Sequence, residues 1–214
     1  MKPYPGYLFD LDGTLVDTAP DINAALNAAL VEHGYQRVNE ALTRHWIGHG
    51  AKVLVEQAFD YHRKPHHESD IVLTAFLAYY ETHVADLSRP YPGVLDALLS
   101  LHTRGARLAV VTNKMTTFSV AILNALGMAQ HFDAVVCGDT TASPKPAADP
   151  ALHACKALGI APSDALFVGD SETDVLCARA AGCPIVCVRD GYNHGVPAAQ
   201  LGADAVIESF SDLV

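Results

Sequence analysis

Four aspartates stand in two short segments of the chain, each directly after an apolar run. Asp10 and Asp12 follow YLF near the start, and Asp170 and Asp174 follow LFVG in the second half. Carboxylates can act as nucleophiles or proton donors, and their oxygens are the ligands that hard divalent ions such as Mg²⁺ prefer. Like charges in one small space raise one another's pKa or require a cation. If the two segments meet, the sequence predicts an oxygen-donor site for a divalent ion.

Three further side chains could complete such a site. Thr112 and Asn113 close the apolar run RLAVV, and Lys145 stands in SPKPA, where the prolines would hold its loop extended. Lys145 is the candidate cation among the carboxylates, although a lysine considered alone is usually a solvated surface residue. Asp174 considered alone would be a helix-capping residue. Only the cluster as a whole favours a functional reading.

Short, continuously apolar runs recur along the chain and predict β-strands. Such runs are typical of strands buried on both faces of a parallel sheet. Because ligands of open α/β sheets bind beyond the carboxyl ends of the strands, the polar residues that close these runs would meet at one edge. The runs are GYLFD, ARLAVVTN, FDAVVCGD, DALFVGDS and PIVCVRDG, with ADAVIES as a candidate sixth.

The segment between the first two runs has helical spacing instead. One stretch begins at DTAP and ends at Gly34, a second follows IGHGA, and the third is ESDIVLTAFLAYYETHVADL. SRPYPGV then predicts a hinge, because prolines and a glycine interrupt the pattern. We therefore expect an α/β fold: a Rossmann-like parallel sheet core, residues 1–16 and 89–214, with an inserted all-helical domain, residues 17–88.

Composition narrows the class of protein. The 214 residues are 50% hydrophobic and carry a formal net charge of -10, which suits a globular domain and disfavours nucleic acid or an anionic membrane as partner. The five cysteines are odd in number and form no C-x-x-C pair, so we expect reduced, buried thiols. No run resembles a signal peptide or a membrane span, and we expect a cytoplasmic protein.

Other motif-based readings fail on spacing. Counted from Asp10, a calcium-binding EF-hand loop needs glycine at its sixth position, where this chain has Leu15. The sequence also lacks the glycine-rich motifs of nucleotide and dinucleotide sites and the G-x-S-x-G motif of serine hydrolases.

Four segments, in order along the chain, resemble the motifs of the haloacid dehalogenase superfamily. They are DLDGTLVD, VVTNK, SPKPAADP with Lys145, and VGDSETD. The resemblance implies that Asp10 is a nucleophile that forms an aspartyl-phosphate and that Asp12 is the general acid and base. It implies Mg²⁺ bound by the Asp10 carboxylate, the Asp12 carbonyl and Asp170, with Asp174 outside the ring of ligands.

The same resemblance implies how a phosphoryl group would be held. Thr112 and the backbone at Asn113 would bind phosphoryl oxygens, and Lys145 would neutralise charge. An acid at position 12 is absent from relatives that do not protonate an alkoxide leaving group, so Asp12 points to phosphoryl transfer. The helical insertion is similar to the cap domain of the superfamily.

Three segments resemble the phosphoglycolate phosphatase subgroup: DLDGTLVDTAPDI, WIGHGAKVLVE and DGYNHG. The implied substrate is a small phosphorylated metabolite, most simply 2-phosphoglycolate. His49 and Lys52 depart from the subgroup's pattern. Either they bind the carboxylate of the substrate, or His49 starts a helix and Lys52 is solvated, and the sequence leaves both readings open. GYNHG is likewise either a substrate contact or a turn.

Two alternatives to a phosphatase remain. A β-phosphoglucomutase-like phosphomutase would keep every core motif, and a non-catalytic binding protein could use the same scaffold. The sequence gives no indication of oligomeric state.

Overall fold

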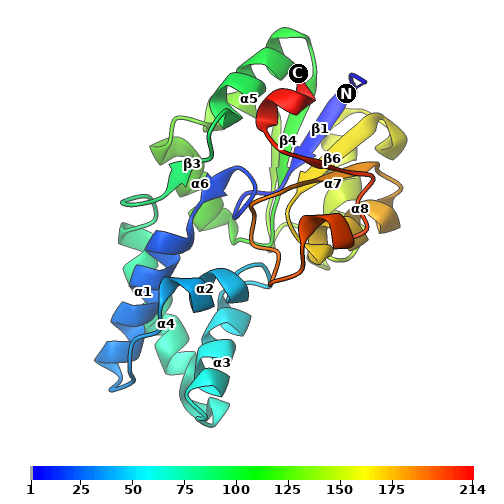
Figure 1. Ribbon diagram of the computed structural model, residues 1–214. Helices are drawn as coiled ribbons and strands as arrows, with labels where there is room; N and C mark the ends of the chain where they lie inside the picture. Colours follow the sequence, from blue (N-terminus) through cyan, green and yellow to red (C-terminus); the bar gives the residue numbers. More distant parts are fainter. Residues whose placement is uncertain (1) are drawn as a thin grey trace.

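Six parallel strands form the centre of the protein in a computed structural model that describes residues 2–214 (Figure 1). The strand order is β5-β4-β1-β6-β7-β8, so β1 lies between β4 and β6. All six apolar runs form strands with parallel neighbours, which confirms the predicted α/β core. The bounds are β1 Gly6–Phe9, β4 Arg107–Val111, β5 Ala134–Val136, β6 Ala165–Gly169, β7 Ile185–Val188 and β8 Ala205–Ile207.

Helices cover both faces of the sheet. Tyr7 and Phe9 of β1 pack in one apolar cluster with α5 and α6, and Leu8 packs in the other with α7 and α8, as alternation along a strand requires. This double burial explains why the strands read as continuous apolar runs. The helices are α5 Val94–Thr103, α6 Thr116–Ala125, α7 Asp149–Leu158 and α8 Glu172–Ala181, with 3₁₀ turns at Ala129–His131, Pro162–Asp164, Ala198–Gln200 and Phe210–Leu213.

Four further helices form a bundle at one end of the core, at the lower left of Figure 1. We call this bundle, α1 to α4, the cap. The three predicted helical stretches correspond to α1, α3 and α4, whereas α2 was not predicted: it has seven residues, and its start is marked by Asn39, whose side chain accepts from the backbone N–H of Leu42. The bounds are α1 Ala19–Glu32, α2 Glu40–Trp46, α3 Ala51–Tyr61 and α4 Ser69–Thr82, with a 3₁₀ turn at His66–Glu68.

Two short segments join the cap to the core. The two-residue strands β2, Val16–Asp17, and β3, Arg89–Pro90, pair antiparallel. Neither was predicted, because two residues carry no periodicity. The segment that returns from α4 to β3 is also bound to α1. Buried Asp21 of α1 accepts hydrogen bonds from the backbone N–H groups of Leu87 and Ser88 and from the Ser88 hydroxyl. The cap helices fall within residues 17–88, and the domain boundaries stay a prediction.

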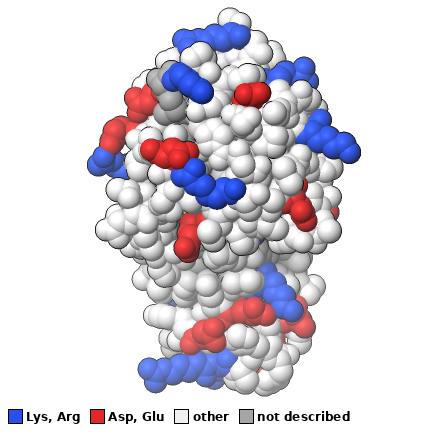
Figure 2. All heavy atoms as spheres, turned by 90° about the vertical axis from the view of Figure 1, so that its right-hand side faces the viewer, with Lys and Arg blue, Asp and Glu red and all other residues white. Residues whose placement is uncertain are grey.

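The surface is mixed in charge on the face that Figure 2 shows, where basic side chains lie among acidic ones. No helix within residues 2–214 is long and apolar enough to cross a membrane. All five cysteines are buried and free, as predicted for reduced thiols.

Candidate active site

The end of β1 places Asp10 at the middle of the sheet's carboxyl edge. Its backbone N–H still donates to the carbonyl of Val168 at 3.0 Å, so the chain leaves the sheet only after this residue. It then turns at Gly13, which has φ of +85°, and a Cβ there would lie 2.5 Å from Oδ2 of Asp170. Only glycine fits this close approach. Asp12, within the turn, lines the same cavity as Asp10.

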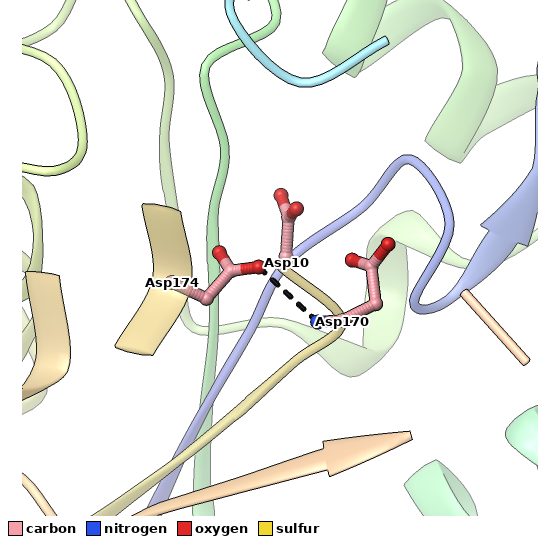
Figure 3. A group of neighbouring side chains, drawn as sticks. All are labelled: Asp10, Asp170 and Asp174. Carbon is pink, nitrogen blue, oxygen red and sulfur yellow. Dashed lines mark hydrogen bonds between the residues drawn. The ribbon is translucent and has the colours of Figure 1, made fainter. Parts of the chain in front are cut away.

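Asp10, Asp170 and Asp174 come together from β1, β6 and α8 (Figure 3), with one carboxylate oxygen of each within 4.8 Å of the others. Burial raises the pKa of Asp10 from 3.8 to about 7, with Asp174 and Asp12 adding to the rise and Lys145 opposing it. Burial, followed by the charges of Asp174 and Asp10, also raises the pKa of Asp170 well above its usual value. Crowded, buried oxygen donors of this kind fit a hard divalent ion.

Lys145 lies inside this cluster, as the sequence predicted. Its Nζ is 2.8 Å from Oδ1 of Asp10 and 2.7 Å from Oδ1 of Asp174, and its side chain is 2% exposed. Burial alone would lower the pKa of Lys145, but the two carboxylates outweigh burial and raise it above its ordinary value. Lys145 is therefore a fixed positive charge behind Asp10.

Asp174 uses both carboxylate oxygens on protein donors. Oδ1 accepts from Lys145, and Oδ2 accepts from the backbone N–H groups of Asp170 and Ser171 and from the Ser171 hydroxyl. Asp174 thus closes the first turn of α8, which agrees with a helix-capping residue, and at the same time orients Lys145. Little of its lone-pair capacity is left for an ion.

Asp170 is held differently. Oδ1 accepts from the Thr14 hydroxyl at 2.7 Å, and Oδ2 accepts from the backbone N–H of Tyr192. Each oxygen has a single protein donor, so each keeps room for a further contact. Asp10 and Asp170 are therefore the carboxylates of the cluster that fit direct contact with an ion, and Asp174 fits a supporting position.

Asp12 has a partner that sequence analysis did not single out. Its Oδ1 and Oδ2 lie 3.0 and 3.3 Å from Nζ of Lys114, whose side chain is 6% exposed. Burial alone would lower the pKa of Lys114, but Asp12 and Tyr80 outweigh it and raise the pKa. Lys114 directly follows Thr112 and Asn113, so its place at the end of β4 was the available signal.

Thr112 and Asn113 lie beside Asp10 at the end of β4, and both line the cavity. The Asn113 side chain donates to the carbonyls of Gly48 and Lys145, each at 3.0 Å, and accepts from the Lys145 backbone N–H at 2.9 Å. It therefore fixes the Lys145 loop and joins the core to the cap. The Thr112 hydroxyl accepts from the backbone N–H of Lys114.

A cavity of about 110 Å³ opens between these core residues and the cap. Sites for drug-sized ligands are usually about 300–1,000 Å³, so this one suits a small molecule. Its charged side chains come from the core, and its walls come largely from apolar side chains of the cap and α6, with Tyr80 of the cap adding a hydroxyl. The lining residues are Asp10, Asp12, Ile22, Ile47, Gly48, Gly50, Ala51, Leu54, Phe76, Tyr80, Thr112, Asn113, Lys114, Met115 and Phe118.

His49 and Lys52 are not among the residues that line this cavity, although Gly50 between them is. The Lys52 side chain is 66% exposed, and its Nζ is 4.0 Å from Oε1 of Glu56. The His49 ring stacks on the ring of His194 with centroids 5.1 Å apart. Burial, and then His194, lower the pKa of His49. Their assignment to substrate recognition stays a prediction.

The GYNHG segment connects the site to the cap. The Tyr192 hydroxyl donates to Oδ1 of Asp17 at 2.6 Å and accepts from the backbone N–H groups of Thr18 and Ala19. The tyrosine hydroxyl thereby provides a hydrogen-bond acceptor for the backbone N–H groups at the start of α1. The backbone N–H of Tyr192 donates to Asp170. Arg44 of α2 binds Asp17 at 2.8 Å and lies over the Tyr192 ring. Sequence analysis missed this connection, which joins residues far apart in the chain.

The site combines a strand-end aspartate, a second acid two residues later, a strand-end threonine, a buried lysine and a third carboxylate. This combination agrees with a match to a protein-family model. The model, haloacid dehalogenase-like hydrolase, matches residues 7–188. The chain belongs to this family. The predicted superfamily is therefore confirmed.

Named relatives within the haloacid dehalogenase-like hydrolases cover nearly the whole chain. A phosphoglycolate phosphatase of Nitrosococcus oceani is 39% identical over 209 residues, which are 96% of this chain and 93% of that protein. Phosphoglycolate phosphatase 1 of Pseudomonas aeruginosa is 40% identical over 97% of this chain and 77% of that protein. The crystal structure of a predicted phosphoglycolate phosphatase from Haemophilus somnus superimposes with a TM-score of 0.94, at 36% identity over 100% of this chain and 97% of that one.

Proposed function

We propose that the protein is a Mg²⁺-dependent phosphatase that hydrolyses a small phosphate monoester, most simply 2-phosphoglycolate, through an aspartyl-phosphate on Asp10. One observation carries the proposal: Asp10 lines a small cavity, with Lys145 2.8 Å from one of its carboxylate oxygens and Asp12 lining the same space. The names of the relatives supply the substrate, and the size of the cavity agrees with it.

In the first step, an oxygen of Asp10 attacks phosphorus as the bond to the leaving oxygen breaks. Asp12 gives its proton to that oxygen, which leaves as an alcohol. Lys145 offsets negative charge on the nucleophile, and Thr112 offers its hydroxyl to a phosphoryl oxygen. In the second step, Asp12 takes a proton from water, the water oxygen attacks phosphorus, and Asp10 is released with inorganic phosphate.

A divalent ion fits this site, because its acidic donors are buried oxygens: burial raises the pKa of Asp10 and Asp170, and repulsion among the carboxylates adds to the rise. Asp10, Asp170 and the Asp12 carbonyl would hold it, with Asp174 behind them. When bound, Mg²⁺ supplies positive charge against the phosphoryl group. We also propose that residues 17–88 act as a cap that excludes water, and that the enzyme works in the reducing cytoplasm, where its free thiols persist.

The test is phosphate release from a panel of small phosphate esters, with added Mg²⁺ and with chelator. We expect Asp10→Asn to lower kcat by at least about 1,000-fold, since the amide is not a nucleophile. The matched control is Asp96→Asn, the same change at an exposed position of α5, which should keep wild-type turnover. Near-normal turnover by Asp10→Asn would refute the covalent mechanism. Isomerised sugar phosphate without free phosphate would instead identify a phosphomutase.

A further inference from the structure

The cavity contains a lysine that the proposed mechanism does not use. Lys114 is the one lysine or arginine among the residues that line it. Lys145, the other buried lysine of the site, lies behind Asp10, where it binds Asp10 and Asp174. The Lys114 ammonium therefore offers the positive charge that a molecule inside the cavity can reach.

The contacts of Lys114 leave its ammonium available. It binds one group, the carboxylate of Asp12, and its Nζ lies 4.7 Å from the centroid of the Tyr80 ring. An ammonium has three N–H donors, and a carboxylate contacted through both oxygens uses at most two of them. At least one donor can thus turn to a ligand without giving up Asp12.

Tyr80 of the cap lies next to the Lys114 ammonium. This residue of α4 is 2% exposed and lines the cavity, and its hydroxyl has no hydrogen-bond partner among the described residues. A buried hydroxyl without a partner is costly unless a ligand or water satisfies it. Phe76 and Phe118 pack against the Tyr80 ring, with centroids 5.6 and 5.1 Å away, and hold it in place.

The surroundings favour an anionic ligand group at this point. The nearby walls are apolar side chains, among them Leu54, Phe76 and Phe118, so a charge placed there would be poorly hydrated and would depend on its partner. A carboxylate would meet an ammonium and a hydroxyl donor, and a neutral group would not gain the same charge-assisted hydrogen bond.

We propose that Lys114 and the Tyr80 hydroxyl form a subsite for a second anionic group of the substrate. The preferred substrates are then small phosphate monoesters that carry a carboxylate one or two carbons from the ester oxygen. This inference rests on the proposed phosphatase function and moves recognition of the carboxylate from His49 and Lys52, which do not line the cavity, to two residues that do.

The test compares kcat/KM for 2-phosphoglycolate with kcat/KM for 2-hydroxyethyl phosphate, in which a neutral alcohol replaces the carboxylate. The ratio of the two values cancels any effect that a substitution has on Asp12, because both esters need the same proton transfer. We expect the wild type to prefer phosphoglycolate by at least about tenfold, and Lys114→Met to lower that preference by about 10- to 100-fold. The loss should fall mainly on KM.

Tyr80→Phe keeps the ring and removes the hydroxyl, so it should lower the preference by about 2- to 10-fold. Lys64→Met makes the same charge change at an exposed position of the cap and should leave the preference unchanged. If Lys114→Met fails to fold, the wild-type preference and Tyr80→Phe still decide the question.

Three results would overturn the inference. The first is a wild type that hydrolyses both esters equally well. The second is a Lys114→Met variant that loses both activities to the same extent, which would assign Lys114 to support of Asp12 alone. The third is a preference that collapses in Lys52→Met and not in Lys114→Met. A wild type that hydrolyses neither ester nor any other phosphate would refute the proposed function itself, and the subsite with it.

Discussion

The positive charge of Lys145 offsets the repulsion among the buried carboxylates of the site. Its ammonium touches Asp10 and Asp174, and both contacts are buried. A buried charge left without its partner is strongly destabilising, whereas the intact pair contributes much less than its Coulomb energy suggests, because both ions lose their hydration. Removal of Lys145 should therefore be costlier than removal of an ordinary surface lysine.

We predict that Lys145→Met lowers the free energy of unfolding by about 3–5 kcal/mol in chelator at pH 8. Without the lysine, the pKa of Asp10 should rise above its present value of about 7. An acid whose pKa is higher in the folded than in the unfolded protein loses stability as pH rises toward the folded value. The difference between variant and wild type should thus be smaller at pH 6 than at pH 8.

Urea unfolding at the two pH values measures this difference. Lys156→Met, at an exposed position of α7, provides the control and should change the free energy of unfolding by less than about 0.5 kcal/mol. An equal loss at pH 6 and pH 8 would contradict the assignment of the effect to Asp10.

The sequence predicted the positions of the site residues that directly follow a strand. Asp10, Thr112 and Asp170 each follow an apolar run, and parallel strands bring their carboxyl ends to one edge. Lys114 and Tyr192 were missed for a common reason: their contacts involve elements that are distant in the chain. Lys114 meets Tyr80 of the cap, and Tyr192 meets the start of α1. The place of Lys114 at the end of β4 could have indicated that it is near the site, but spacing along the chain could not indicate either of these contacts.

Helices and strands were predictable where burial imposes a pattern of apolar residues over enough of the chain. The six strands read clearly because both faces are buried, and α1, α3 and α4 are long enough to show helical spacing. The seven-residue α2 and the two-residue strands β2 and β3 are too short for periodicity, so the double connection between cap and core was expected only as a proline-rich hinge. In the structure this connection depends on Asp21 of α1.

We predict that Asp21→Ala lowers the free energy of unfolding by about 2–4 kcal/mol, because it leaves the buried N–H and hydroxyl of Ser88, and the partly buried N–H of Leu87, without an acceptor. Urea unfolding followed by circular dichroism measures the change. Asp70→Ala, in the exposed first turn of α4, is the matched control and should cost under about 1 kcal/mol. Equal effects of the two substitutions would refute a special contribution of Asp21.

Across the whole molecule, the cap meets the core along a seam next to the site. Asn113 of the core donates to the Gly48 carbonyl, and the His194 ring contacts the carbonyl of His45 through Nδ1 at 2.7 Å. His194 also stacks on His49. In this arrangement residues of the cap form one side of the cavity, and we expect the seam to loosen during substrate exchange.

We predict that His49, stacked on His194 at this seam, makes cap closure dependent on pH. Burial and the neighbouring His194 lower the pKa of His49 from 6.5 in the closed arrangement. A base with a lowered pKa stabilises the closed state fully above pH 6.5, and that stabilisation is lost as pH falls below 6.5. Closure should therefore weaken in mild acid, and kcat/KM should fall with it.

His194→Asn tests the contribution of His194 to this effect, because asparagine tolerates the positive φ of 53° at position 194 and removes the ring that stacks on His49. We expect the ratio of wild-type to variant kcat/KM to be constant above pH 7 and to fall as pH is lowered from 6.5 to 5.5. Titration of Asp10 and of the substrate phosphate is shared by both proteins and cancels in the ratio. A ratio that stays flat over the whole range would show that the histidine pair does not govern closure.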